Sequence, residues 1–298
     1  MPTILLPEQV TTDTMRKTII EFRQYVDSLS EGGELDIDLR TMTFIEPSGV
    51  ISLSNIVQWS RQHKSINVNF LIDSKATSKN LKAMHYLSDC GFFANFGEEK
   101  VFKEPKLRRT MLALKTLETN HLNQWRQSDL MVWLQRQTGR SNDFSAICVA
   151  IDEIFNNIAD HSTENIGSIF GQYYPKNHEI VIAISDFGIG IPSSLKNKFS
   201  GEKTDDEWII EALKEGVSTQ SVPQNRGAGL ANIIRALTTN GVGSVTIMSN
   251  CGKVILKNNE IVDALTFDES YQGTFFELRI DTSNPALYDS EEEEDFVW

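Results

Sequence analysis

The chain has 298 residues, of which 40% are hydrophobic and 23% charged, and its formal net charge is -13 at pH 7. This composition is ordinary for a globular protein of about two domains, and it excludes collagen-like and wholly disordered classes. The negative charge would repel a phosphate backbone, and no apolar run approaches the roughly 20 residues of a membrane helix. We therefore expect no nucleic-acid partner and no membrane. Three widely spaced cysteines form no disulfide framework and the start resembles no signal peptide, which points to the cytoplasm.

Strands and helices alternate in the first third of the chain. The hydrophobic pattern predicts helices over residues 14–29, 50–62 and 78–87, and strands over residues 4–6, 35–39 and 68–72. A further short strand is expected to end at Ile45. Such alternation is typical of an α/β layer structure, so we expect an N-terminal α/β domain over residues 1–98.

The turn after Ile45 carries one candidate site. It reads Glu46-Pro47-Ser48-Gly49 and leads into an apolar helix, so Ser48 is expected beside a helix N-terminus, where negative charge is favoured. The segment resembles the strand-to-helix turn of STAS domains of the anti-sigma-factor-antagonist type, with Glu46 and Pro47 in place of the family's aspartate and first serine. In that family the serine before the glycine accepts a phosphate, which makes Ser48 a candidate phosphorylation site. The alternative is that Ser48 is only a helix N-cap.

The segment over residues 99–140 is rich in Leu, Arg, Gln and Lys. Apolar residues recur in it at helical spacing, among them Trp125, Leu130, Trp133 and Leu134. We expect one or two helices here that link the two halves of the chain.

A first chemical motif is the stretch CVAIDEIFNNIADHS, residues 148–162. At helical periodicity its apolar residues fall on one face, together with Ile147, and its polar residues cluster on the opposite one: Glu153, Asn157, Asp160 and His161. Solvation explains a polar face, but a Glu and an Asn one turn apart also suit a metal ion or a bound water. His161 is expected to have a structural role at the helix end.

A second motif is EIVIAISDFGIGIP. A β-branched run over residues 180–184 is typical of a buried strand, and Asp186 follows it directly. A carboxylate at a strand end accepts a hydrogen bond from an exocyclic amine, and Gly188 and Gly190 let the backbone approach a flat ligand closely. A plain turn would explain the same residues taken alone.

A third motif is NRGAGLANIIRAL, residues 225–237. Gly227 and Gly229 precede an apolar helix, and a glycine-rich turn at that place offers backbone N–H groups to phosphates. The motif lacks the Gly-Lys-Ser/Thr ending of a P-loop and the full Rossmann pattern. Taken alone, it is also explained by an ordinary helix start.

In this order and spacing the three motifs resemble the N, G1 and G2 boxes of the GHKL (Bergerat-fold) ATPase superfamily, over about residues 140–280. The resemblance implies an overall class of α/β and α+β, with a Bergerat-fold α/β sandwich over residues 141–282 after the STAS-like domain. It also implies ATP and Mg²⁺ as ligands, and an ATP lid over residues 192–225 without stable structure. Two departures are the absence of a Phe-rich box in that lid and Ile158 in place of the usual alanine.

The resemblance also implies roles for single residues. Asn157 would be the Mg²⁺ ligand, Glu153 the general base or water-orienting group, and Asp186 the acceptor for the adenine amine. The remaining ATP-binding positions are glycines of the two turns and a threonine of the closing strand over residues 273–280: Gly188, Gly190, Gly227, Gly229 and Thr274.

The sequence around the three motifs indicates which kind of GHKL protein this chain resembles. His121 lacks the residues that follow a sensor-kinase phosphoacceptor, and only about twenty residues, with an acidic tail over 283–298, follow Ile280, so no gyrase-like transducer domain is expected. The resemblance is therefore to the anti-sigma-factor serine kinases. We expect a bacterial signalling protein, an Mg-ATP-dependent ATPase or serine kinase with a regulatory protein partner, as a monomer or homodimer. The alternative is an ATP-gated protein-binding module that hydrolyses ATP slowly or not at all.

Overall fold

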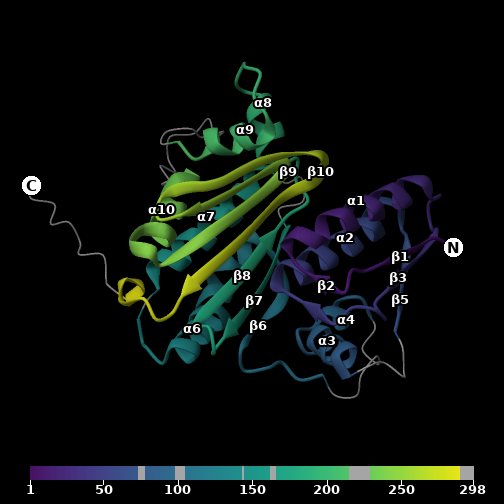
Figure 1. Cartoon of the computed structure of the whole chain (residues 1–298), viewed down its shortest axis with the longest axis horizontal. Coiled ribbons are helices and arrows are strands. Elements are labelled where there is room, and N and C mark those ends of the chain that lie inside the picture. Colours follow the sequence, from purple (N-terminus) through teal and green to yellow (C-terminus); the bar gives the residue numbers. More distant parts are fainter. Residues whose placement is uncertain (73–77, 98–104, 143, 162–165, 215–228, 289–298) are drawn as a thin grey trace, which may run out of the picture.

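The structure is a computed structural model, and it describes residues 1–72, 78–97, 105–142, 144–161, 166–214 and 229–288. Within these residues the chain is mixed α/β, with a three-stranded parallel sheet near the N-terminus and a five-stranded antiparallel sheet built from later residues (Figure 1). None of the described helices combines the length and the apolar run that crossing a bilayer requires.

The small sheet has the strand order β1-β3-β5 and consists of β1 (Thr3–Leu5), β3 (Glu34–Asp38) and β5 (Asn67–Leu71). Four helices accompany it: α1 (Thr12–Ser28), α2 (Pro47–Lys64), α3 (Ser78–Asp89) and α4 (Phe92–Asn95). Short strands β2 (Gln9–Val10) and β4 (Phe44–Ile45) pair beside them. Every strand and helix predicted for this part of the chain is present, with ends that differ by three residues or fewer.

The start of α2 differs from the N-cap expectation for Ser48. Glu46 is the N-cap and Pro47 is the first helical residue, so Ser48 lies inside the helix. Proline suits this position because the first helical N–H has no partner within the helix. A Cβ atom on Gly49 would lie 2.6 Å from Val10 Cγ1, so glycine lets α2 approach the strand beneath it.

The large sheet has the order β6-β7-β8-β10-β9, which places β8 in its centre. Its strands are β6 (Met111–Glu118), β7 (Ile166–Tyr174), β8 (Glu179–Ser185), β9 (Gly243–Lys257) and β10 (Glu260–Asp281). The helices of this part are α5 (Leu122–Trp125), α6 (Met131–Thr138), α7 (Ser145–His161), α8 (Ile191–Lys196), α9 (Asp205–Ala212) and α10 (Gly229–Thr238).

The segment expected to be a helical linker is in part a strand. Residues 111–118 form β6, which pairs with β7 at the edge of the large sheet. Its leucines also fit a helical pattern, but pairing with a neighbouring strand outweighs that weak local preference. Trp125, Leu130 and Trp133 follow in helical turns and lie in the core beneath the sheet.

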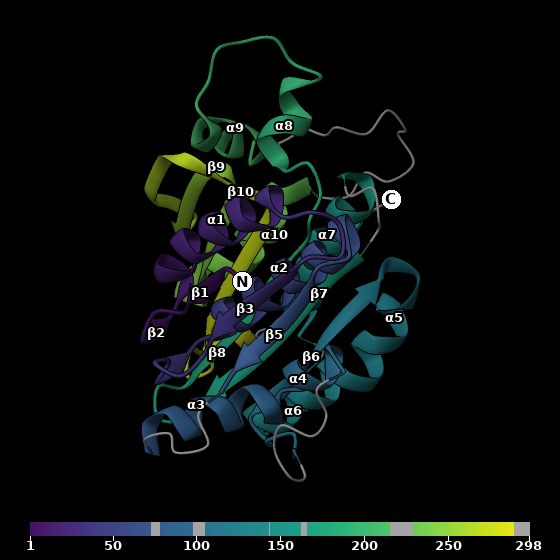
Figure 2. The ribbon, with the colours of Figure 1, turned by 90° about the vertical axis from the view of Figure 1, so that its right-hand side faces the viewer.

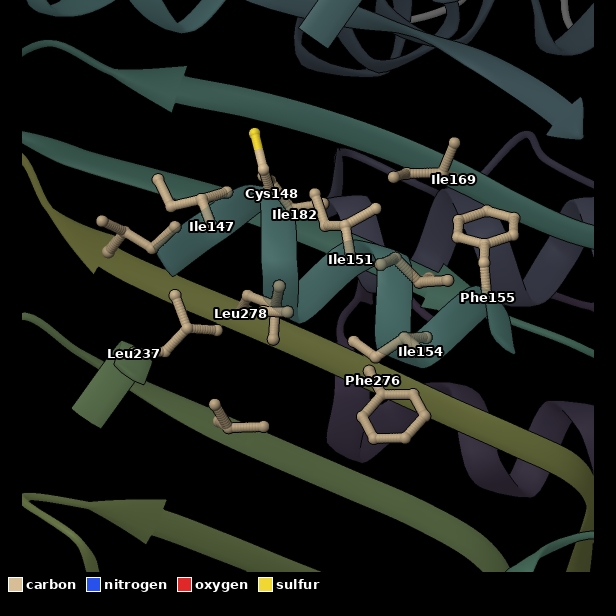
Figure 3. Packing of buried hydrophobic residues seen from close by; sticks show 14 of the residues in the cluster. Ile147, Cys148, Ile151, Ile154, Phe155, Ile169, Ile182, Leu237, Phe276 and Leu278 are labelled. Carbon is tan, nitrogen blue, oxygen red and sulfur yellow. The ribbon is translucent and has the colours of Figure 1, made fainter. Parts of the chain in front are cut away.

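Side chains of the large sheet alternate between two separate cores. Ile182, Ile184 and Phe276 point to a core shared with α7 and α10, whereas Ala183 and Phe275 point to a core shared with α1 and α2. Figure 3 shows the first core, in which Ile151 and Ile154 of α7 face sheet residues. Because both faces are covered, β8 is an almost continuous apolar strand, as its sequence predicts.

The result is a stack of layers that Figures 1 and 2 show from two sides. Helices α7 and α10 cover one face of the large sheet, and α1 and α2 lie between its other face and the small parallel sheet. Helices of the N-terminal third are therefore packed against β8, which ends directly before Asp186, and β10, which contains Thr274.

Candidate functional site

The central feature of the site is a buried carboxylate directly after β8. Asp186 is 6% exposed, its backbone N–H donates to the carbonyl oxygen of Thr274 over 2.9 Å, and its carboxylate accepts the backbone N–H of Gly188. Burial raises the pKa of Asp186 to about 6, while hydrogen bonds from the backbone of Gly188 and Thr274 act in the opposite direction. Among the described residues, no cation is one of the groups that shift this pKa. A carboxylate held in this way is suited to accept a hydrogen bond from a donor group of a ligand.

Two glycines with positive φ angles allow neighbouring segments of the chain to approach each other closely around Asp186. Gly273 has φ +82°, and a Cβ atom on it would lie 2.2 Å from the carbonyl oxygen of Asp186. Gly190 has φ +84° and precedes α8, and its Cβ atom would overlap Asn250 Oδ1. Side chains at either position would collide with these neighbours, so both turns need glycine. Gly188 is buried between them.

A hydroxyl network holds the opposite side of the same turn. The Oγ atom of Ser249 donates to the carbonyl oxygen of Gly273 over 2.9 Å and accepts the backbone N–H of Ile191 over 2.9 Å. Thr274 Oγ1 lies 3.0 Å from the same Ser249 Oγ. Because Ser249 has one hydroxyl proton, which goes to Gly273, Thr274 is the donor in this last bond. Thr274 and the residues after Asp186 are thus tied together through one serine.

Helix α7 brings its polar residues to the same end of the sheet as Asp186. Phe155 and Ile158 of α7 pack closely on Gly167 of β7, where a Cβ atom would lie less than 3.0 Å from both side chains. The next residue, Ser168, pairs with Ser185, which immediately precedes Asp186. Residues Ile147, Ile151, Ile154, Phe155 and Ile158 are all buried, as predicted, whereas Glu153 and Asn157 are half-buried on the other side of the helix.

Several predicted positions lie outside the described residues or differ from expectation. Gly227 is outside the described residues, as is the acidic tail from residue 289, and Gly229 is the first residue of α10. Nothing is described for the side chains of Asp160 and His161.

The segment expected to be an ATP lid, residues 192–225, contains most of α8 and all of α9. This contradicts the prediction that the segment has no stable structure. Asp205 of α9 binds Lys196 over 2.6 Å and the backbone N–H of Cys251 over 2.9 Å, which anchors these helices on β9.

Ser48 lies far from this turn in the sequence and is buried in α2. Its side chain is 1% exposed, and its hydroxyl has no hydrogen-bond partner among the described residues. A phosphate of roughly two negative charges could not be accommodated there while α2 stays packed against the sheet. Phosphorylation of Ser48 stays a prediction, but it requires a different position of α2.

Sequence reasoning missed three residues that shape the site. Ser249 and Tyr271 belong to no recognisable motif. Tyr271 comes close to the site only through the pairing of β10 with β8, and its hydroxyl lies 2.8 Å from Oγ of Ser185, the residue before Asp186. Gly273 stands directly before Thr274, so the Gly-Thr pair was the one available signal for it. No protein-family model matches this chain, and no curated protein matches it either. The functional interpretation therefore depends on the motifs and on the geometry around Asp186.

Proposed function

We propose that the chain is an Mg-ATP-binding regulatory protein of the GHKL type, an ATPase or serine kinase that acts with a regulatory protein partner in the cytoplasm. The observation that supports this proposal best is the buried Asp186 carboxylate, which is held by backbone N–H groups and has no cationic partner in the part of the chain that the structure describes. Its surroundings, Gly188, Gly190 and Thr274, fit a flat ligand that approaches the backbone.

Adenine suits this carboxylate better than guanine does. The carboxylate oxygen that remains after the bond to Gly188 would accept from the exocyclic amine of adenine. Guanine presents a carbonyl oxygen at that position, so two acceptors would face each other, at a cost of about 1–3 kcal/mol. Asp186 is therefore proposed as the residue that selects ATP over GTP.

Asn157 and Glu153 are proposed for the metal and for turnover. Among the described residues no group of three His, Cys, Asp or Glu side chains could hold a metal ion. An Mg²⁺ ion that keeps several waters and takes phosphate oxygens needs only one or two protein ligands, and the amide oxygen of Asn157 would serve as one. Glu153, one turn earlier on the same helix, would orient or deprotonate a water or hydroxyl group.

The test is thermal unfolding with nucleotide. Mg-ATP at a hundred times its dissociation constant should stabilise the wild type by about 2.7 kcal/mol, and GTP should stabilise it less. Asp186→Asn should abolish this effect. The control Asp281→Asn changes an exposed carboxylate at the end of β10 and should behave like the wild type. Equal stabilisation by ATP and GTP, or by ATP in Asp186→Asn, would contradict the proposal.

A second candidate is an ATP-gated binding module, and the packing of α1 and α2 on the large sheet favours it. A nucleotide that changes this packing would alter the surface offered to a partner or to a second copy without hydrolysis. Release of the γ-phosphate distinguishes the two candidates. Glu153→Gln should keep ATP binding and slow turnover by about 10²–10⁴-fold if the protein is an enzyme. Absence of any turnover or phosphoryl transfer in the wild type would favour gating.

A further inference from the structure

The N-terminal domain meets the proposed nucleotide site at a small cavity. This cavity of about 10 Å³ lies between Ile19 of α1, residues of α2 and two residues from the site side, Phe187 and Tyr271. Phe187 directly follows Asp186 in the chain, and Ser52, Ile56 and Trp59 are the α2 residues in the lining. The turn that carries Asp186 therefore borders the same cavity as helices that are more than 120 residues away in the sequence.

Tyr271 lies between the two sides, because it lines the cavity together with Ser52 of α2 and its hydroxyl bonds Ser185 next to the Asp186 turn. Its side chain is 4% exposed, and its hydroxyl lies 2.8 Å from Ser185 Oγ, which donates to the carbonyl oxygen of Thr274 over 3.0 Å. Since that bond uses the serine proton, Tyr271 donates to Ser185. Burial raises the pKa of Tyr271 to about 12. On the α2 side, Tyr271 lines the same cavity as Ser52.

The local geometry of β10 explains why Tyr271 points to α2. The pairing of β10 with β9 shifts on both sides of this residue, between Thr266 and Tyr271 and again between Tyr271 and Thr274. Such irregularities re-aim side chains and occur next to functional sites. Helix α1 holds the same stretch, because Arg16 lies over the ring of Phe267 and Arg23 donates to the carbonyl oxygen of Ser270.

We propose that Tyr271 is a positioning residue that couples the seating of α2 on the large sheet to the arrangement of Asp186 and Thr274. Through it the N-terminal domain regulates nucleotide binding, and by linkage nucleotide binding stabilises the seated position of α2. The regulatory half of this proposal rests on the proposed ATP-binding function. The structural half, the coupling of α2 to the Asp186 turn, does not.

The structural half is tested without nucleotide by hydrogen exchange of the full chain. Tyr271→Phe removes one hydroxyl and should speed amide exchange about five- to ten-fold both in residues 50–57 of α2 and in residues 186–191, where the Gly188 and Ile191 amides report on the turn. Ser52→Ala, a milder change on α2 itself, should also speed exchange in residues 186–191. The control Tyr86→Phe alters a tyrosine that contacts Phe170 elsewhere on the same interface and should leave residues 186–191 unchanged. Unchanged exchange there in Tyr271→Phe and Ser52→Ala overturns the coupling.

The regulatory half is tested by titration with Mg-ATP. Tyr271→Phe and Ser52→Ala should weaken the binding of Mg-ATP about five- to ten-fold. Mg-ATP should slow amide hydrogen exchange in residues 50–57 of the wild type but not in those of the two variants. Normal affinity in both variants overturns regulation through Tyr271. If the wild type binds no ATP, the proposed function fails, and the nucleotide-free experiment still decides the coupling.

Discussion

A Cβ atom on Gly273 would lie 2.2 Å from the carbonyl oxygen of Asp186. The two residues are brought together where β10 ends its irregular stretch and begins to pair with β8, at Phe275 and Ser185. This close approach lets the backbone at Thr274 hold Asp186, because its carbonyl oxygen accepts the Asp186 N–H over 2.9 Å.

Gly273→Ala should therefore both destabilise the protein and remove ATP binding. The positive φ angle and the clash together should lower the free energy of unfolding by about 3 kcal/mol or more. Gly97→Ala is a matched control, because Gly97 has nearly the same φ angle, +81°, and open space around it. In this control the free energy of unfolding should fall by only about 1–2 kcal/mol. Urea unfolding of both variants measures the difference, and equal losses would show that the contact with Asp186 is unimportant.

Asp186→Asn should make the protein more stable at neutral pH. The folded-state pKa of about 6 lies above the ordinary value of 3.8, so the folded protein binds this proton more tightly than the unfolded chain does. The corresponding stability is present below about pH 4 and is lost as the pH rises through 6. A pKa difference of about two units between the folded and the unfolded state lowers the free energy of unfolding of the wild type by about 3 kcal/mol at pH 7.5, and Asp186→Asn should avoid this loss.

The same substitution should remove ATP binding while it stabilises the fold. If the asparagine oxygen keeps the bond to the Gly188 N–H, its amide nitrogen faces the ligand, and two donors then oppose each other. Thermal unfolding of wild type and variant between pH 4 and pH 7.5 checks the first effect. A stability difference that does not change with pH would mean that Asp186 has an ordinary pKa.

Asn157→Ala should remove the Mg²⁺-dependent part of ATP binding. An amide oxygen is a hard neutral ligand of the kind that Mg²⁺ prefers, and its loss cannot be compensated by a methyl group. The neighbouring residue offers a control, since Asn156 is exposed on the same helix and Asn156→Ala should bind as the wild type does. Titrations with ATP, with and without Mg²⁺, measure the effect. If both variants bind equally well, the metal ligand is not Asn157.

Ser48→Ala should leave the free energy of unfolding unchanged or raise it slightly, because the buried hydroxyl has no hydrogen-bond partner among the described residues. Ser48→Asp should destabilise the protein by about 3 kcal/mol or more, since it buries a charge in the interface between α2 and the large sheet. Mass spectrometry after incubation with Mg-ATP should find the Ser48 peptide unmodified under conditions in which the protein stays folded. A phosphorylated Ser48 in stable, folded protein would show that α2 leaves the sheet readily.

Local pattern was enough to predict the parts of the site that lie on regular elements. The apolar face of α7 follows from a period of 3.6 residues. The continuous burial of β8 and the position of Asp186 at its end follow from an unbroken apolar run. The helix that begins at Gly229 follows in the same way as α7, whereas the strand containing Thr274 was expected from the resemblance to the closing strand of the GHKL superfamily. The assignment of β6 was wrong because its pairing with β7, which is distant in the sequence, outweighs the local pattern.

The amino-acid sequence is enough to show which chemical groups this protein possesses and which of them share a helix face or a strand end. Three features depend on the tertiary structure: the burial of Ser48, the cover of the second face of the large sheet by α1 and α2, and the place of Tyr271 between α2 and Ser185. The physical reason is the distance along the chain. Residues such as Ser52 and Tyr271 meet because two separate apolar surfaces are buried against each other, and no local periodicity records which surface of one domain covers which surface of another.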